Sequence, residues 1–533
     1  MSAPAVTPAT ETARKGLPMW AILSLSLAIV GPTLAMSGNA SGLALAVGKS
    51  APLVMLIGLV GVALVGYAFI RLTRHMSHSG SAYALVGRTM GPRAGFFSGF
   101  ALIATYLGFA AGCAGLFASF VNSFIAACQE GSSNPWQIPW IIPALAAIAV
   151  AAAVSKFNTR TTLNVLLWVE GVGIIGMIIL AIVIFGRGGA HGVTPGGTGI
   201  DWGAFSLGHG TNFSAVLGGV VTAFLCWAGF EGCATLGEES ANPKRDIPRT
   251  LSGSLILTGI LFIVVMFAQT VGFGTNAAGL KLMGSSGNTV GVLAEQFIGQ
   301  WFSLIIIFCG CMSSFACHLA SAQSTGRMVA AFARDGFFPK SLAAHDERTG
   351  APVNATWATL GICLVIALIS LWTKWPNLGS GDGVALYMYF FYATAGCITL
   401  MVVYFMVEIS ALWFILAPKF RQVAGNAAKP LGIALTIIGA AGIVLILGFN
   451  IKNTDVGGTI TWASPVYLGL GWCLLGLVVA LIATELVTKI GAGLTAQIEL
   501  VGEHPSRSVV LEAADDITAY HGHEVGGTAV DGE

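Results

Sequence analysis

Twelve apolar runs, each long enough to cross a lipid bilayer, follow one another through this 533-residue chain. A helix needs about 20 predominantly apolar residues to span the hydrocarbon of a membrane. The runs lie at 18–47, 53–70, 94–127, 138–154, 162–185, 214–237, 252–271, 302–332, 356–371, 385–414, 431–449 and 466–484. Because they fill most of the chain, the sequence predicts an all-α polytopic membrane protein with 12 transmembrane helices.

The composition excludes a water-soluble globular protein. Hydrophobic residues make up 55% of the chain and charged residues 9%, against about a quarter in soluble domains. The 70 glycines favour a closely packed bundle, because small residues let helices approach each other in lipid. The net charge of +1 gives no reason to expect a nucleic-acid partner. No Cys-x-x-Cys pair occurs, and nine of the ten cysteines lie in apolar surroundings, so we expect no metal and no cofactor.

The distribution of positive charge predicts the orientation. Of the 25 Lys and Arg residues, 20 fall in one set of alternate connecting segments and five in the other. Lys and Arg concentrate in cytoplasmic loops of membrane proteins. We therefore expect a multi-pass protein of the cell membrane with both termini in the cytoplasm.

Two short interruptions stand within these apolar runs. Gly31 and Pro32, followed by the small and polar stretch 37–42, interrupt the first run, and the stretch 226–232 interrupts the sixth. Broken helices survive at membrane depth only where they line a cavity or are buried in protein. Such breaks in corresponding positions of the two halves of a chain are typical of the substrate site of a transporter.

Three longer motifs resemble those of one transporter family. They are Phe-Leu-Cys-Trp-Ala-Gly-Phe-Glu at 224–231 with its continuation at 237–249, Ser-Gly-Ser-Ala-Tyr at 79–83 with Gly-Pro-Arg-Ala-Gly-Phe at 91–96, and Arg-Met-Val-Ala-Ala-Phe-Ala-Arg-Asp-Gly-Phe-Phe-Pro at 327–339. Their order and spacing resemble the amino acid-polyamine-organocation (APC) superfamily of permeases. The resemblance covers roughly residues 15 to 487.

The resemblance implies a LeuT-like fold with a 5+5 inverted repeat, in which helices 1 and 6 are broken. The first repeat (helices 1–5) would occupy 18–185, the second (helices 6–10) 212–415, and two further helices 430–487. Residues 1–17 and 488–533 are polar, so we expect cytoplasmic tails, the first disordered and the second mostly disordered.

The direction of the half-helices predicts how a solute binds. If the outer half of helix 1 begins near Ser37, its free N–H groups suit a carboxylate. The carbonyl groups that end the outer half of helix 6 suit an ammonium group. Together they favour an α-amino acid. The predicted substrate-binding residues are Ser37, Gly38, Asn39, Tyr106, Phe224, Cys226, Trp227 and Gly229.

Three ionisable residues are candidates for ion coupling, because such groups are costly at membrane depth. Glu170, where some relatives carry a lysine, would bind the coupling proton, or alternatively accept hydrogen bonds from the broken helix 1. Glu231 would cap the inner half of helix 6 and support gating, or contact a cationic solute. His318 would titrate near neutral pH or be a hydrogen-bonded core residue.

Hydroxyl and aromatic residues complete the predicted site. Ser313 and Ser314 lie where related folds bind sodium, so sodium coupling remains an alternative to proton coupling. Trp227 and Phe230 flank the second break and would gate the substrate, or simply pack on neighbouring helices.

These features predict a secondary active transporter that imports an amino acid with protons by alternating access. One alternative keeps the fold and changes the cargo to a polyamine, an organic amine or an inorganic cation. Another is an amino acid exchanger. A channel or a membrane-embedded enzyme is remote, because the sequence contains no selectivity-filter repeat and no nucleophile motif.

Overall fold

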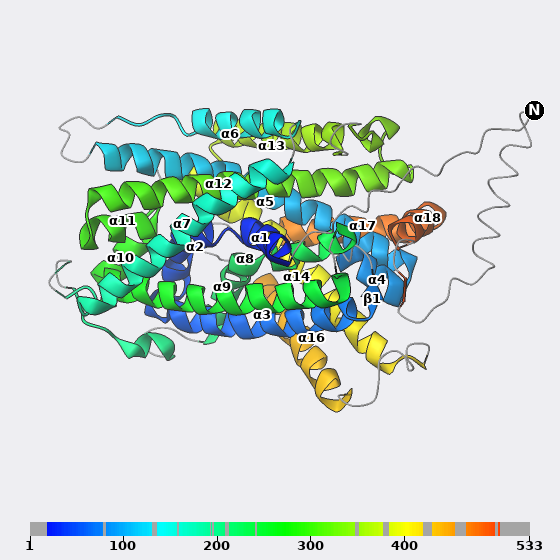
Figure 1. Cartoon of the computed structure of the whole chain (residues 1–533), viewed down its shortest axis with the longest axis horizontal. Coiled ribbons are helices and arrows are strands. Elements are labelled where there is room, and N and C mark those ends of the chain that lie inside the picture. Colours follow the sequence, from blue (N-terminus) through cyan, green and yellow to red (C-terminus); the bar gives the residue numbers. More distant parts are fainter. Residues whose placement is uncertain are drawn as a thin grey trace, which may run out of the picture.

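The computed structural model describes residues 19–77, 82–129, 136–156, 159–191, 193, 197–207, 213–239, 242–346, 351–376, 383–418, 429–452, 465–495 and 499–500. Helices dominate this part of the chain, which confirms the all-α class (Figure 1). The α-helices are α1 (Met19–Val30), α2 (Pro32–Val47), α3 (Ala51–Thr73), α4 (Ala82–Met90), α5 (Pro92–Cys128), α6 (Ile141–Val154), α7 (Thr159–Gly186), α8 (Phe213–Trp227), α9 (Pro243–Phe273), α10 (Ala277–Ser285), α11 (Thr289–Phe297), α12 (Gln300–Arg334), α13 (Val353–Thr373), α14 (Gly383–Leu416), α16 (Lys429–Lys452), α17 (Pro465–Ile482) and α18 (Thr484–Thr495). Short 3-10 helices are η1 (Gly48–Ser50), η2 (Trp202–Phe205), η3 (Phe230–Glu239) and η4 (Lys340–Ala343), and the two short strands are β1 (Met76–Ser77) and β2 (Glu499–Leu500).

Each of the twelve predicted runs coincides with helix. Ten stretches within the described residues are long and apolar enough to cross a membrane, and one of them joins α2 and α3 over Pro32–Thr73. The run at 138–154 forms only the 14 residues of α6. At 1.5 Å per residue α6 is about 21 Å long, less than the hydrocarbon thickness of about 30 Å. The polytopic membrane class therefore holds, and twelve crossings remain a prediction.

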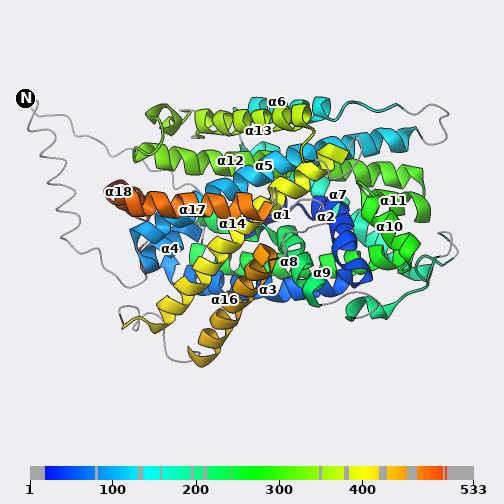
Figure 2. The same cartoon turned by 180° about the vertical axis from the view of Figure 1, so that it is seen from behind.

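Glycines let the central helices pack closely. α5 packs along both α12 and α14 through the middle of the bundle, while α6 and α13 lie side by side at one edge (Figure 2). Gly108, Gly112 and Gly115 on one face of α5 lie against the backbone of α14, where an added Cβ would meet main-chain atoms. Small residues at one-turn spacing allow such close approach in membrane bundles.

Several short elements lie outside the predicted runs. α10 and α11 connect α9 to α12, and Asn276 and Asn288 cap them by accepting hydrogen bonds from Gly279 N (2.7 Å) and Gly291 N (2.8 Å). α18 extends beyond residue 488, where we expect the C-terminal tail to begin. β1 and β2 pair antiparallel, which joins the segment after α18 to the end of α3.

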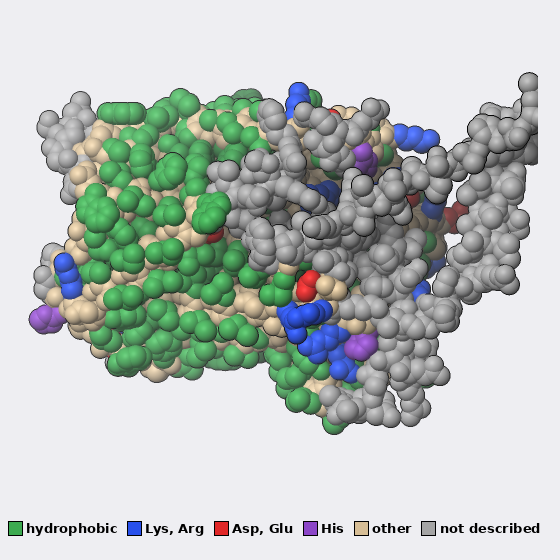
Figure 3. All heavy atoms as spheres, viewed as in Figure 1, with side chains coloured by type: hydrophobic (Ala, Val, Ile, Leu, Met, Phe, Trp, Pro, Cys, Tyr) green, Lys and Arg blue, Asp and Glu red, His purple; other side chains and the backbone are tan. Residues whose placement is uncertain are grey.

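Apolar side chains cover most of the left half of the face seen in Figure 3, and most of the basic side chains drawn there lie in its right half. Trp168, Ile175 and Ile182 of α7 are largely exposed on the bundle surface. Ser26, Asn39 and His318 lie fully inside. Apolar residues outside and polar residues inside are the arrangement expected of a protein whose solvent is lipid.

Candidate functional site

The first helix is broken at a single residue. α1 ends at Val30, Gly31 adopts a left-handed conformation (φ 55°, ψ 65°), and α2 begins at Pro32. The expectation that the outer half begins near Ser37, Gly38 and Asn39 is therefore wrong, because these residues lie inside α2. Glycine tolerates the left-handed conformation, and proline at the first helical position has no N–H to satisfy.

The amide groups at the start of α2 all have partners. Pro32 has no N–H, and Thr33 N donates to Glu170 Oε1 (2.6 Å). Leu34 N donates to Ser313 Oγ (3.1 Å), and Ala35 N donates to Gly31 O (2.8 Å). The first amides of a helix need partners from outside the helix when they are buried. Here the protein itself supplies them.

Glu170 on α7 and Ser313 on α12 thus meet at the end of α2. Glu170 is only 4% exposed. A carboxylate at the positive end of a helix dipole is stabilised there. This geometry agrees with the alternative in which Glu170 accepts hydrogen bonds from the broken helix. Ser314 donates to Gly310 O within α12 (2.9 Å), and the predicted sodium site at Ser313 and Ser314 stays a prediction.

The sixth predicted helix is broken over two residues. α8 ends at Trp227, and the 3-10 helix η3 follows Ala228 and Gly229, which has φ 96°. Leu225 O accepts from Ala228 N (3.2 Å). The last carbonyl groups of a helix lack partners within the helix, and the end of α8 therefore presents acceptor groups.

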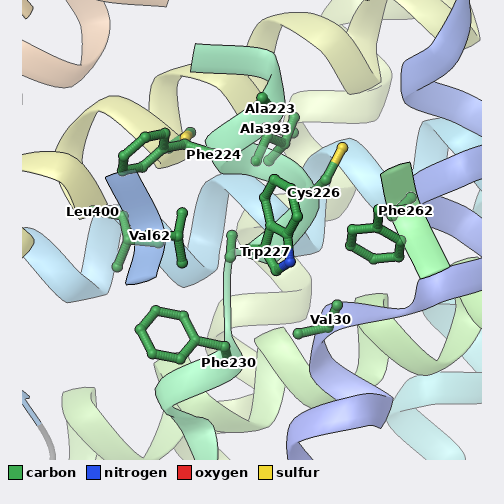
Figure 4. Packing of buried hydrophobic residues seen from close by; sticks show 14 of the residues in the cluster. Val30, Val62, Ala223, Phe224, Cys226, Trp227, Phe230, Phe262, Ala393 and Leu400 are labelled. Carbon is green, nitrogen blue, oxygen red and sulfur yellow. The ribbon is translucent and has the colours of Figure 1, made fainter. Parts of the chain in front are cut away.

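The two breaks lie against each other. A Cβ at Gly229 or at Gly232 would collide with the side chain of Ile29, the residue before the end of α1. The Ser26 hydroxyl donates to Phe230 O (2.9 Å) and accepts from Cys233 N (3.2 Å). Figure 4 shows Val30 of α1 close to Phe230 and Trp227. The discontinuities seen in the sequence are therefore brought together inside the protein.

Two tyrosines hold the carboxylate of Glu231, the second residue of η3. Tyr404 of α14 donates to Oε2 (2.7 Å), and Tyr106 of α5 donates to Oε1 at the longer distance of 3.5 Å. Glu231 is 4% exposed. Tyr106, which we expect to contact substrate, contacts this carboxylate in the described conformation.

Trp227 and Phe230 are both packed into the core. The Trp227 indole N–H donates to Thr258 Oγ1 of α9 (3.1 Å), and its ring lies 5.3 Å from that of Phe262. Phe230 packs edge-on against Phe69 of α3 with ring centroids 5.8 Å apart. These contacts agree with the packing alternative for both aromatics, and a gating role remains a prediction.

Asn39 links three helices next to the second break. Its Oδ1 accepts from Tyr389 of α14 (2.9 Å), and its Nδ2 contacts Cys226 Sγ of α8 (3.4 Å). The structure thus brings two predicted binding residues together. Phe224 turns towards α3, where it lies against Gly61, and Gly38 lies against Leu116 of α5.

Two polar residues near α2 were not singled out in the sequence. Gln269 of α9 donates to Met36 O (3.1 Å), and Thr289 of α11 lies 3.2 Å from Ser37 O. Gln269 Oε1 and Ser37 Oγ are buried and have no hydrogen-bond partner among the described residues. Gln269 is the only amide side chain in the predicted apolar run 252–271. An isolated polar residue in such a run indicates a candidate site residue.

His318 of α12 faces α5. Its Nδ1 lies 2.7 Å from Ala110 O, and its Nε2 is buried without a partner in the part of the chain that the structure describes. A bond from a ring N–H to a backbone carbonyl fixes the tautomer and the orientation of the ring. The geometry agrees with a hydrogen-bonded core histidine.

Comparison with known proteins identifies the family. The sequence model described as "Amino acid permease" matches residues 17–479. The chain belongs to this permease family. The resemblance to APC permeases is thereby confirmed, and with it the transporter class.

Individual relatives differ in the solutes that their names give. The chain is 26% identical over 325 residues to "Branched-chain amino acid permease BcaP" of Lactococcus lactis, covering 58% of this chain and 66% of the relative. It is 24% identical over 379 residues to "Low-affinity putrescine importer PlaP" of Escherichia coli K12, covering 69% and 77%. It is 26% identical over 355 residues to human "Cationic amino acid transporter 4", covering 62% and 52%.

Proposed function

We propose that this permease is a secondary active transporter that imports a small organic amine by alternating access, driven by protons. The observation that carries the proposal is the inventory of hydrogen-bonding groups at the paired breaks. The backbone amides that follow the first break are bonded within the protein, whereas buried side-chain oxygens on and beside α2 have no partner among the described residues. A solute that brings donors and a positive charge fits this inventory better than one that brings a carboxylate.

The donor side of the inventory argues against a substrate carboxylate at the first break. A substrate carboxylate at this break would need the amides of Thr33 and Leu34 as donors. Both are already bonded, to Glu170 Oε1 and Ser313 Oγ. A buried amide can satisfy only one strong acceptor at a time. The negative charge that the end of α2 attracts is therefore already provided by Glu170.

The acceptor side supports an ammonium group. Gln269 Oε1 and the hydroxyl oxygens of Thr33 and Ser37 are buried without partners among the residues described, and each of these oxygens can accept a hydrogen bond. Glu231 adds a carboxylate beside the second break. A protonated amine has up to three donors to distribute among such groups. The likeness to a putrescine importer supports the same class of cargo.

An α-amino acid is the second candidate, and the likeness to a branched-chain amino acid permease favours it. It requires Glu170 to release Thr33 N. Protonation would weaken the acceptor strength of the Glu170 carboxylate and free this amide for a substrate carboxylate. In this second scheme Glu170 is the coupling residue, as the sequence predicts, and sodium bound near Ser313 is the alternative driving ion.

Matched pairs of compounds distinguish the two candidates, because each pair differs only in the α-carboxylate. Putrescine is compared with ornithine, cadaverine with lysine, and 3-methylbutylamine with leucine. Purified protein in proteoliposomes is given an inward proton gradient, and uptake of each radiolabelled compound is measured. We expect uptake of at least one amine and little uptake of its carboxylated partner.

The opposite result, uptake of an amino acid but not of the matching amine, would reject the amine proposal in favour of the second candidate. Saturation and counterflow of the transported compound are expected of a carrier, and their absence would indicate a channel. Replacing sodium with an inert cation at a fixed proton gradient tests the driving ion. Accessibility of single cysteines in the two tails tests the proposed cytoplasmic location of the termini.

A further inference from the structure

Glu408 is a buried acid that the site described above does not use. It lies in α14, its side chain is 0% exposed, and neither carboxylate oxygen has a hydrogen-bond partner among the described residues. The carboxyl group fills the space left by Gly439 of α16, where an added Cβ would collide with it. Each other buried acid in the bundle core has partners, as Glu170 and Glu231 illustrate.

The elements around Glu408 offer it no counter-charge. α16 carries Lys429 and Lys452 at its two ends, ten and thirteen residues from Gly439. Among the side chains that the structure describes, the basic residues on the elements that pack against α14, together with the nearby hydroxyl groups, are Arg71 and Tyr67 of α3, Arg88 of α4, Arg93 of α5, Thr436 of α16, and Tyr404 and Ser410 of α14. None of them forms an ion pair or a hydrogen bond with Glu408. The Thr436 hydroxyl donates to Gly432 O (2.9 Å), and the Tyr404 hydroxyl donates to Glu231.

An ionised carboxylate in such a place is strongly disfavoured, because its charge is neither hydrated nor paired. The protonated, neutral form is the one compatible with this packing. An ionisable residue retained at membrane depth without a partner usually takes part in function. We infer that Glu408 is a proton-binding site, which carries a proton in the described conformation and releases it when α14 and α16 separate enough to admit water.

The position of Glu408 connects this proton to the solute site. Tyr404 lies one helical turn before Glu408 on α14, and residues four apart share a helix face. Tyr404 holds Glu231 at the second break. A movement of α14 that exposes Glu408 to water would therefore also disturb the bond to Glu231. This inference rests on the proposed function and deepens it by naming the residue that binds the driving proton.

The first experiment detects the proton without measuring transport. Infrared difference spectra of the purified wild-type protein and of Glu408→Gln are compared in the carbonyl region of protonated carboxylic acids. We expect a band in the wild type that is lost in Glu408→Gln, shifted in Glu408→Asp and retained in Glu170→Gln. Identical spectra of the wild type and Glu408→Gln would overturn the inference.

The second experiment measures coupling. Gln is a neutral mimic of protonated Glu, so Glu408→Gln is expected to keep solute counterflow within about threefold of the wild type. It should lose accumulation driven by a proton gradient and the pH dependence of uptake. Glu408→Asp should recover both in part, and Ser410→Ala, at a buried neighbour in α14, should leave both unchanged. Accumulation by Glu408→Gln equal to that of the wild type would overturn the inference.

Failure of the proposed function gives a different pattern. In that case the wild-type protein transports none of the amines or amino acids. The infrared band of Glu408 is unaffected, because its detection does not depend on transport. A Glu408→Gln protein that neither binds nor transports solute is checked by its thermal stability and by Glu408→Asp. Loss of function in both variants with an unchanged infrared spectrum would contradict a role in proton binding.

Discussion

The two helix breaks differ in what surrounds their ends. The break at Gly31 is one residue long, and the amides that follow it are bonded to Glu170 and Ser313. The break at Ala228 and Gly229 follows the carbonyl end of α8 and is followed by ten residues of 3-10 helix. The backbone amides at the first break are thus satisfied without a solute, whereas the last carbonyl groups of a helix retain bonding capacity.

Elementary hydrogen-bond chemistry explains this difference. Each amide has one proton to donate, and a buried amide without a partner is rarely tolerated. Each carbonyl oxygen has two lone pairs, so a carbonyl with one free lone pair costs less. A protein that must keep both breaks buried therefore satisfies the amide end itself and can leave the carbonyl end for a ligand. The following predictions test this asymmetry, from the largest expected effect to the smallest.

Removing the carboxylate at the first break should have the largest effect. Glu170→Ala leaves Thr33 N, a buried amide at the start of α2, without its partner. Each unpaired buried group costs about 1–3 kcal/mol. We expect a clear fall in the thermal unfolding temperature and loss of transport, with a smaller fall for Glu170→Gln, whose amide oxygen still accepts a bond. Glu485→Ala, an exposed acid on α18, is the control. Equal stability of Glu170→Ala and the control would contradict the capping role.

The contact between the breaks offers a sharper test. A Cβ at Gly232 would collide with the outer methyl group of Ile29, Cδ1, at 2.5 Å. A Cβ at Gly229 would instead collide with its Cγ2. Valine lacks Cδ1 and keeps Cγ2. We therefore expect transport to fall about tenfold or more in Gly232→Ala and in Gly229→Ala, and Ile29→Val to rescue the first only.

Gly229 also has a positive φ, which an alanine adopts with strain, so its substitution should resist rescue for two reasons. Uptake and thermal stability of the four variants and of Ile29→Val alone complete the cycle. Rescue of both substitutions, or of neither, would show that the breaks do not touch in the way described.

Trp227 tests whether the second break has an aromatic gate. In Trp227→Phe the bond to Thr258 Oγ1 is lost and the ring volume falls slightly. If Trp227 only packs, we expect a stability loss of about 1 kcal/mol and an unchanged KM for the transported solute. A tenfold or greater rise in KM at unchanged stability would instead indicate contact with the solute.

The smallest effect is expected at a link between two segments that lie outside the predicted apolar runs. Lys49, just after α2, and Asp201, before α8, form an ion pair of 3.0 Å. The hydrogen bond from Lys49, with help from Gly203 N, lowers the pKa of Asp201 below its ordinary value. Stability from this pair is therefore present above the unfolded pKa of about 3.9 and is lost as the pH falls through the lowered folded value.

The Asp201 side chain is 32% exposed, so the pair contributes no more than about 1 kcal/mol. Asp201→Asn should lower the thermal unfolding temperature slightly at neutral pH and match the wild type in strong acid. A difference that persists at low pH would mean that Asp201 stabilises the protein in some other way.

Sequence analysis located the helices well because hydropathy alone selects segments that can be buried in lipid. The predicted interruption of helix 1 includes Gly31 and Pro32, but the start of its outer half was placed near Ser37, more than one turn too late, because Ser37, Gly38 and Asn39 were treated as helix-breaking residues. In a buried environment the backbone of these residues gains more from helical hydrogen bonds than their side chains lose. The left-handed residue at Gly31 provides the break instead.

The candidate site was predicted only in part. Glu170 and Glu231 were singled out because each is an acid within an apolar run. Glu408, in the run 385–414, has the same property but was not singled out. Their partners could not be found in this way. Asn39 and Tyr389 are 350 residues apart in the chain, and Thr33 and Glu170 are 137 apart, so these pairs depend on how the helices pack.

The length of α14 has a consequence for the order of events during transport. Tyr389 near one end binds Asn39 on α2, and Tyr404, 15 residues further along, binds Glu231 on η3. These attachments are about 22 Å apart along a stiff rod. Tilting this rod at one membrane face would strain the attachment near the other. Under the proposed alternating access, this coupling would keep the two faces from opening at the same moment without a dedicated lid.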